Sequence, residues 1–224
     1  MEYNGGTLYL MTSPAVHVID DDAGTRRAVS RLLRSYNYSV QSYSSAAQFL
    51  SQKIPPGPAC LVLDLRMPGI NGLDVQEILS HGDEYVPIIF VSGQADIETS
   101  VRAMKAGAID FLTKPFDDHQ LLSAVVAALE LSERALAKRE EFKRDQAAFV
   151  SLTPREQEVC IGIARGLLNK QVGFELGTTE KTVKAQRARV MQKLGASSLP
   201  DIVRLVERLR LAGAISDAHD RAHT

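Results

Sequence analysis

The stretch VLDLRMPGING, residues 62–72, places a carboxylate, Asp64, directly after an apolar run and just before a sharp turn. Burying a charge beside such a run is costly unless another group compensates it. A short apolar run bounded by turn residues predicts a buried strand, and the Met-Pro-Gly turn leads the chain away from it. The sequence therefore predicts an aspartate that stands open at the end of a buried strand.

Apolar strands alternate with helices through the first half of the chain. Such a pattern indicates a parallel sheet with helices on both faces. For residues 14–131 it predicts an α/β domain, a doubly wound parallel sheet of five strands in the order 2-1-3-4-5. The strands are expected at residues 15–20, 38–43, 59–64, 86–91 and 108–112, and the helices up to residue 36 and at 46–52, 72–81 and 96–106.

The middle of the chain is predicted to be helical. Residues 117–145 contain neither proline nor glycine, and their apolar stripe thins out after Leu136. This pattern favours a helix of the α/β domain that continues as a solvated helical linker over residues 132–150. A coiled-coil stalk for dimerisation is the alternative, but it requires an apolar repeat that is sustained further along the helix.

The last third of the chain fits a smaller, all-α domain of four helices over residues 151–213. Thr153, Pro154 and Glu156 have the spacing of a capping box at the start of its first helix. The other helices are expected at 169–176, 179–194 and 199–212, and the segments outside both domains are an N-terminal extension at 1–13 and a frayed tail at 214–224.

Composition and charge describe a globular protein with two different ends. The 224 residues are 45% hydrophobic and 24% charged, and no apolar run approaches the ~18 residues of a membrane span. The chain does not begin like a signal peptide, and neither Cys60 nor Cys160 has a metal-ligand neighbour. We therefore expect a cytoplasmic protein with reduced thiols and no membrane contact. Residues 1–120 carry 9 Lys and Arg against 14 Asp and Glu, whereas residues 151–224 carry 12 against 8, which indicates different partners.

Polar side chains follow the predicted strands at the points where the strands end. They are Asp20, Asp21 and Asp22 after the first strand, Asp64 at the third, Ser92 at the fourth and Lys114 at the fifth. In a doubly wound sheet, ligands bind at the carboxyl ends of the strands. Clustered carboxylates need a cation, and hard oxygen ligands with open positions favour Mg²⁺. Asp64 is then a candidate nucleophile toward a phosphoryl group, with the metal and Lys114 offsetting the oxygen charge.

Residues 15–131 resemble the receiver domain of two-component response regulators. The matching stretches are VIDDD, LDLRMPGING, VSGQAD and DFLTKPF, in this order and spacing. The resemblance implies that Asp64 accepts a phosphoryl group from the phosphohistidine of a sensor histidine kinase. It also implies an Mg²⁺ site formed by Asp21, Asp64 and the backbone carbonyl of Arg66, with Asp20 holding a metal-bound water.

The same resemblance implies roles for the other residues of this predicted pocket. Ser92 and Lys114 would each bond a phosphate oxygen, and Phe111 would be the aromatic switch that turns inward when Ser92 moves. Ser92 departs from the threonine that is more usual there, but it keeps the hydroxyl group. Asp22 lies outside the usual acidic pair and is expected to be a charge at a helix N-terminus.

A basic stretch near the C-terminus has the spacing of a helix-turn-helix. GTTEKTVKAQRARVMQKLG, residues 177–195, holds five Lys and Arg against one acid and follows a predicted helix. In a helix-turn-helix the second helix enters the major groove of DNA. Val183 and Val190 are expected to face the core, with Lys184 and Arg187 on the opposite side.

Residues 152–212 resemble the LuxR-type output domain, and the whole chain resembles the NarL/FixJ class of response regulators. The matching stretches are LTPREQEV, GLLNKQVGFELGTTEKTVK and RVMQKLGASS. Gly173 replaces the usual alanine, at an expected cost of up to ~1 kcal/mol in helix stability. Gln186 replaces a histidine, and glutamine can read an adenine edge. The candidate DNA contacts are Asn169, Lys170, Thr179, Lys181, Thr182, Lys184, Gln186, Arg187, Arg189 and Lys193.

Together these features predict a transcription factor that phosphorylation controls. It is not expected to be an enzyme, apart from self-phosphorylation and slow self-dephosphorylation of the receiver. Phosphorylation is expected to pair two receivers through a face that includes Val101, Met104 and Lys105, so that a homodimer binds two-fold promoter DNA and meets RNA polymerase. The alternatives are a DNA-binding regulator whose receiver acts without phosphorylation, and an Mg²⁺-dependent aspartyl-phosphate phosphohydrolase. The second alternative lacks a paired general acid two residues after Asp64, where Arg66 stands.

Overall fold

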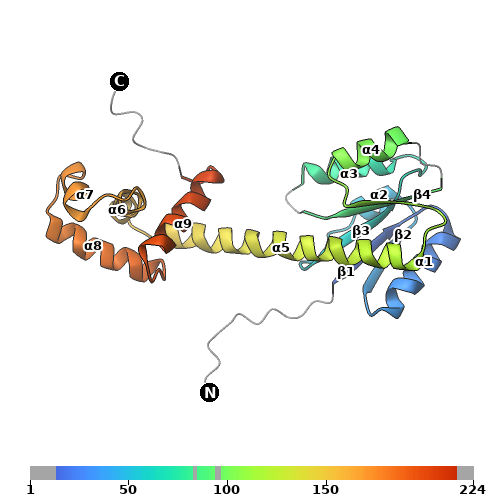
Figure 1. Cartoon of the computed structure of the whole chain (residues 1–224), viewed down its shortest axis with the longest axis horizontal. Coiled ribbons are helices and arrows are strands. Elements are labelled where there is room, and N and C mark those ends of the chain that lie inside the picture. The colour runs from blue at the N-terminus through green and yellow to red at the C-terminus, as the bar shows by residue number, and fades with distance from the viewer. Residues whose placement is uncertain (1–13, 83–84, 94–96, 216–224) are drawn as a thin grey trace, which may run out of the picture. The chain divides into compact units, whose positions relative to one another are not determined.

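The computed structural model describes residues 14–82, 85–93 and 97–215 (Figure 1). The chain divides into two compact units, residues 1–137 and residues 138–224. The expected N-terminal extension and residues 216–224 of the expected tail lie outside the described residues. In the part of the chain that the structure describes, we find no helix that is long and apolar enough to cross a membrane.

The described part of the first unit is built on a five-stranded parallel sheet in the order β2-β1-β3-β4-β5, which confirms the predicted topology. Its strands are β1 (Ala15–Ile19), β2 (Ser39–Tyr43), β3 (Ala59–Asp64), β4 (Ile88–Ser92) and β5 (Asp110–Thr113). Its helices are α1 (Ala23–Ser35), α2 (Ala46–Leu50), α3 (Gly72–Ser80), α4 (Ile97–Lys105) and α5 (Asp118–Val150), of which α5 continues into the second unit.

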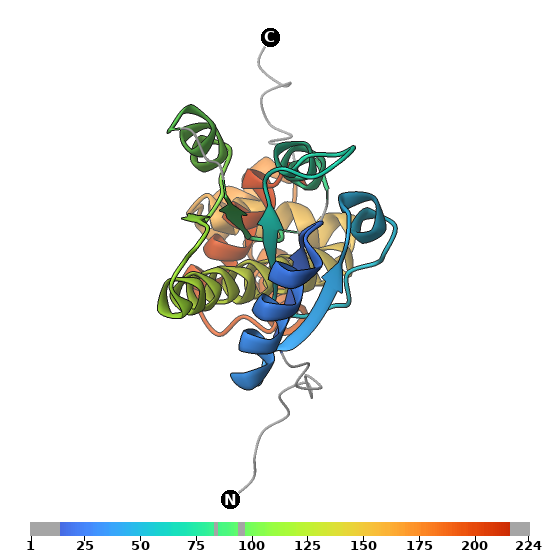
Figure 2. The same ribbon diagram turned by 90° about the vertical axis from the view of Figure 1, so that its right-hand side faces the viewer.

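Side chains along each strand alternate between the two faces of the sheet, and each face has its own helices. In Figure 2, α3 and α4 lie on one side of the sheet, with α2, while α1 and the first part of α5 lie on the other. Val62 packs with the α1 and α5 side, whereas its neighbour Leu63 packs with the other side. Because both faces are covered, the three central strands β1, β3 and β4 are buried along almost their whole length, whereas the edge strands β2 and β5 are partly exposed.

The fourth and fifth strands begin later than predicted. Residue 87 is a proline, which has no N–H to donate to the sheet, so β4 starts at Ile88 and runs on to Ser92. Ala108 donates its N–H to the carbonyl of Ala103 and closes α4, so β5 starts only at Asp110. Both strands also end one residue later than predicted, at Ser92 and Thr113, close to the edge where the predicted polar side chains lie.

The second unit is helical. Its helices beyond α5 are α6 (Pro154–Ala164), α7 (Asn169–Glu175), α8 (Glu180–Lys193) and α9 (Leu199–Leu211). The predicted capping box is present, because Thr153 Oγ1 accepts from Glu156 N at 3.3 Å while Glu156 Oε2 accepts from Thr153 N at 2.9 Å. Val183 and Val190 of α8 are buried in the core, as predicted.

Residues 138–150, at the C-terminal end of α5, belong to the second unit and pack against its other helices. Phe149 is buried in the core of this unit, and Phe142 packs against that core. Arg208 of α9 donates from Nε to Asp145 at 2.7 Å, and its Nη1 pairs with Glu141 at 3.2 Å. The sequence concealed this packing because charged residues separate the two phenylalanines along the helix.

Candidate functional site

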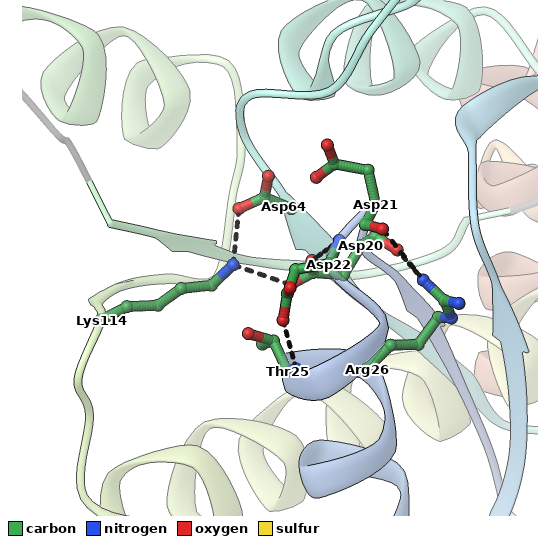
Figure 3. Close-up of polar contacts among 7 residues, drawn as sticks. All are labelled: Asp20, Asp21, Asp22, Thr25, Arg26, Asp64 and Lys114. Carbon is green, nitrogen blue, oxygen red and sulfur yellow. Dashed lines mark hydrogen bonds and ion pairs between the residues drawn. The ribbon is translucent and has the colours of Figure 1, made fainter.

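The carboxyl ends of β1, β3 and β5 bring three predicted residues together. Asp20 follows β1, Asp64 is the last residue of β3, and Lys114 follows β5. Figure 3 shows the two carboxylates and the ammonium group converging at this edge of the sheet. Parallel strands deliver their last residues to one edge, so this convergence follows from the topology.

Lys114 compensates both buried carboxylates. Its Nζ lies 2.7 Å from Asp20 Oδ2 and 2.9 Å from Asp64 Oδ1. Asp20 is 1% exposed and Asp64 is 5% exposed, so neither charge is well solvated. Burial acts to lower the pKa of the Lys114 ammonium, but its bonds to the two carboxylates raise that pKa overall. The charge at the end of the apolar strand β3 is thus tolerated because an ammonium group lies beside it.

Three carboxylates form a cluster that fits a divalent cation. One oxygen each from Asp20, Asp21 and Asp64 can be chosen so that all lie within 4.8 Å of one another, and Asp21 is exposed at the edge. Burial raises the pKa of Asp64, as do the neighbouring charges of Asp20 and Asp21, against the lowering effect of Lys114. Hard carboxylate oxygens that repel one another at an open edge are suitable ligands for Mg²⁺.

Local backbone contacts hold Asp20 in place. Asp22 N–H donates to Asp20 Oδ1 at 2.8 Å, and Asp22 Oδ1 in turn accepts from Thr25 N at 2.6 Å, capping α1. The expectation that Asp22 is a charge at a helix N-terminus is confirmed. Arg26, one turn into α1, donates to the carbonyl oxygen of Asp20 at 2.6 Å (Figure 3). The sequence did not reveal this arginine, because its partner is a backbone atom.

Gly72 lets α3 start against the backbone of Asp64. A Cβ atom at Gly72 would lie 2.7 Å from Asp64 O and 2.8 Å from Phe90 Cε1, so no larger residue fits without a shift. Its N–H donates to Leu65 O at 2.9 Å. Asn71 caps the helix in a reciprocal pair with Asp74. Gly72 therefore allows α3 to begin close to Asp64 and helps to fix the position of this aspartate.

The structure places the remaining predicted residues of the first unit around this edge. Ser92, the last residue of β4, is buried, and Arg66 is exposed on the loop that follows β3. Phe111 of β5 is half-buried, and its ring stacks on Phe90 with centroids 6.0 Å apart. These positions are compatible with the roles that the resemblance implies.

Helix α8 presents a basic face, but not all its predicted residues belong to that face. Lys181, Lys184 and Arg189 are exposed on α8, as is Lys170 on α7. Thr179 caps α8 and accepts from Thr182 N at 3.2 Å, so both threonines lie at its first turn.

Three other predicted DNA contacts lie on the flank of α8, and two of them have partners within the second unit. Arg187 is half-buried and donates to Asn169 Oδ1 at 3.4 Å, so it does not lie opposite the core as expected. Gln186 is half-buried, and its Oε1 is enclosed. Lys193 Nζ lies 2.6 Å from Oε2 of the buried Glu156. Helical periodicity explains these positions, because all three lie three or four residues from Val183 or Val190.

Gly173 lies where α7 approaches the turn before α8. A Cβ atom there would lie 2.9 Å from Thr178 O, and Thr178 N–H donates to Gly173 O at 2.8 Å. The effect of Gly173 is therefore not limited to the expected cost in helix stability. In this structure the missing side chain allows the two segments of the helix-turn-helix to approach each other.

Comparison with known proteins identifies a domain family in each of the two units. Residues 16–126 match the response regulator receiver domain, and residues 150–206 match the luxR family of bacterial regulatory proteins. Nodulation protein W of Bradyrhizobium diazoefficiens is 44% identical over 208 residues, covering 93% of this chain and 92% of that protein. Response regulator protein TodT of Pseudomonas putida is 44% identical, covering 87% and 86%.

The likeness extends to solved structures. The low-resolution structure of response regulator StyR has a TM-score of 0.78 and 44% sequence identity, covering 88% of this chain and 99% of that one. The sequence motifs had pointed to FixJ in particular. FixJ of Azorhizobium caulinodans is 39% identical, covering 93% of this chain and 97% of that protein, a lower identity than that of Nodulation protein W.

A receiver domain and a LuxR-type helix-turn-helix define the class of the protein, a transcriptional response regulator. The chain belongs to the NarL/FixJ family of these regulators. This combination of domains implies a kinase partner and DNA binding. It also makes the protein a regulator of transcription and not a classical enzyme.

Proposed function

We propose that Asp64 accepts a phosphoryl group from a sensor histidine kinase and that this modification controls binding of promoter DNA. The observation that carries the proposal is the arrangement of Asp64 at the open edge of the sheet, with Lys114 2.9 Å away and two further carboxylates beside it. In this proposal residues 14–131 act as the receiver, residues 132–150 as the linker and residues 151–213 as the DNA-binding domain.

The chemistry needs little beyond positioning and charge. A carboxylate oxygen of Asp64 attacks phosphorus, the P–N bond of the phosphohistidine breaks, and the electron pair stays on the leaving imidazole. Lys114 neutralises a phosphoryl oxygen, and Ser92 bonds another. Asp20, Asp21, Asp64 and the backbone carbonyl of Arg66 would hold Mg²⁺, which supplies positive charge to the phosphoryl oxygens when it is bound.

The modification acts by shifting an equilibrium of the receiver. We propose that Ser92, Phe111 and α4 rearrange together, as the family resemblance implies. Val101 and Met104 of α4 are each 44% exposed, an apolar face that suits a second receiver. A homodimer formed there would place two DNA-binding domains on a two-fold site, in the cytoplasm and within reach of RNA polymerase.

The exposed cations of α8 are the proposed contacts with DNA. Lys181, Lys184 and Arg189 would meet phosphates or base edges, with Lys170 near the backbone. Asn169, Thr179, Thr182, Gln186 and Arg187 lie beside them at the ends or flank of the helix-turn-helix. The proposal assigns Lys193 to the ion pair with Glu156, which secures the end of α8 to α6.

The experiment that tests the proposed acceptor is phosphorylation in solution. The wild-type chain, incubated with Mg²⁺ and acetyl phosphate, should gain the mass of one phosphoryl group, measured by intact-protein mass spectrometry. Asp64→Asn should gain none, whereas Asp118→Asn, which removes an exposed carboxylate at the start of α5, should behave as wild type. A label that persists in Asp64→Asn would assign the acceptor to another residue.

A further inference from the structure

Helix α4 is attached to the first unit by few buried groups. Within residues 97–105, Ala103 is the only buried residue, whereas Ile97, Val101 and Met104 are exposed hydrophobic side chains. Burial of apolar surface is the main force that fixes a helix in position. When a helix buries so little apolar surface, its position depends on the other contacts that it makes.

A buried glutamine of α3 reaches α4 at this one buried position. Gln76 is 5% exposed, and its Nε2 donates to the backbone carbonyl of Ala103 at 3.1 Å. A carbonyl oxygen can only accept, so the nitrogen of the amide must face α4. The same carbonyl accepts from Ala108 N–H at 3.1 Å, beside Gly107, whose φ of +94° ends the helix. Gln76 therefore holds the junction between α4 and β5.

The other atom of the amide makes the contact easy to break. Gln76 Oε1 is buried and has no hydrogen-bond partner among the residues that the structure describes. An unpaired buried acceptor costs free energy, and this cost offsets part of what the bond from Nε2 contributes. The outcome is a directional contact whose net strength does not exceed that of an ordinary hydrogen bond, which suits an element that must move.

We propose that Gln76 is a latch, a positioning residue that retains α4 and the start of β5 in the arrangement found beside an unmodified Asp64. The inference rests on the proposed function, in which phosphorylation of Asp64 moves α4. A bond made in one arrangement only shifts the equilibrium away from the other. Loss of a bond of ordinary net strength changes such an equilibrium about three- to tenfold.

The test measures how tightly the full chain binds beryllofluoride, a phosphoryl mimic, in the presence of Mg²⁺. Gln76→Met keeps the length of the side chain and removes the hydrogen bond. Val75→Ala, which truncates a fully buried neighbour on α3, is the control for a loss of packing. Gln76→Asn stays polar but is one methylene shorter, and it takes the place of Gln76→Met if that variant does not fold.

The latch predicts an affinity for beryllofluoride that is about three- to tenfold higher in Gln76→Met than in wild type. It also predicts faster hydrogen exchange at the Ala108 amide, and an unchanged affinity in Val75→Ala. Equal affinity in wild type and Gln76→Met, or an equal gain in Val75→Ala, would overturn the latch alone. A wild type that does not bind beryllofluoride would overturn the proposed function and the latch with it.

Discussion

In the first unit two buried carboxylates, Asp20 and Asp64, share the ammonium of Lys114, whereas in the second unit Lys181 and Lys184 stand exposed on α8. Water screens exposed charges but screens buried ones much less. A new charge beside Asp64 therefore changes the energy of its surroundings strongly, while the charges of α8 act as a constant attraction for phosphates. In the proposed function, this difference suits the first unit to switching and the second unit to salt-dependent attachment to DNA.

The largest effect is expected where the buried charges lose their partner. Lys114→Met should lower the free energy of unfolding of the first unit by about 3 kcal/mol without Mg²⁺, because two carboxylates remain uncompensated. Mg²⁺ should restore part of this loss. Urea unfolding with and without Mg²⁺ measures it, with Lys105→Met, an exposed lysine, as the control. Equal stability of Lys114→Met and wild type without metal would show that the ammonium does not stabilise the pocket.

A smaller effect on stability is expected at the Glu156–Lys193 pair. In the second unit, whose other lysines on α8 are exposed, this pair includes a buried carboxylate. Lys193→Ala leaves the buried carboxylate of Glu156 with only its cap contacts at Thr153. Because the lysine is partly exposed, we expect a loss of about 1 kcal/mol in the free energy of unfolding of this unit. Lys184→Ala should change that free energy by less than about 0.5 kcal/mol. Similar losses in both variants would remove the distinction between the two lysines.

For DNA binding the order of the two effects should be reversed: Lys184→Ala should weaken binding more than Lys193→Ala does. Lys184→Ala should weaken binding to all sequences alike and reduce the slope of log affinity against log salt by about 1, since one phosphate contact is lost. Fluorescence anisotropy at several salt concentrations measures this slope. Lys143→Ala, an exposed lysine of α5 that pairs with Glu140, is the matched control. An unchanged slope in Lys184→Ala would exclude it as a phosphate contact.

The smallest effect concerns pH. Burial lowers the pKa of His17 on β1. The imidazole ring of His17 packs against the rings of Tyr43 and Phe49. Its folded pKa is below the unfolded value, so the unfolded chain binds more protons, and the contribution of His17 to stability falls as pH drops below about 6.5. His17→Phe should therefore flatten the decline in stability of the first unit between about pH 7 and pH 5. Thermal unfolding across this range measures it, and parallel curves for both proteins would contradict it.

The stability of the second unit should depend on pH only in a more acidic range than that of the first unit. Hydrogen bonds from Ser197 and Ser198 lower the pKa of Asp201 to about 2. A carboxylate with a depressed folded pKa contributes stability above its unfolded pKa of about 4, and the contribution is lost as pH falls toward the folded value. Asp201→Asn should remove its share of this dependence and leave that of Glu156, whose pKa is lowered by its hydrogen bond from Lys193. A titration of the second unit that shows its loss above about pH 5 would contradict the assignment to Asp201.

The sequence predicted the sheet order and the convergence of Asp20, Asp64 and Lys114 because both follow from parallel topology. It did not predict Arg26 or Gly72, whose contacts are with backbone atoms and leave no pattern of residue types. Such contacts become visible only when the segments are placed in space.

The positions of Arg187 and Lys193 on α8 were not predicted, for a different reason. Charge density placed both with the exposed cations of the helix, although each lies three or four residues from a core valine and has a partner within the second unit. The partner of Lys193 is Glu156, which lies 37 residues earlier and was predicted only as a helix cap. Periodicity could have separated the flank of the helix from its exposed face, but it could not have named that partner.

The most direct measurement is the oligomeric mass of the wild-type chain and of Asp64→Ala, each with and without Mg²⁺ and beryllofluoride. Analytical ultracentrifugation should show a change from monomer to dimer in the wild type with the mimic, and no change in Asp64→Ala. That result would locate the trigger of dimerisation at Asp64. A wild type that keeps the same mass under both conditions would contradict phosphorylation-driven dimerisation.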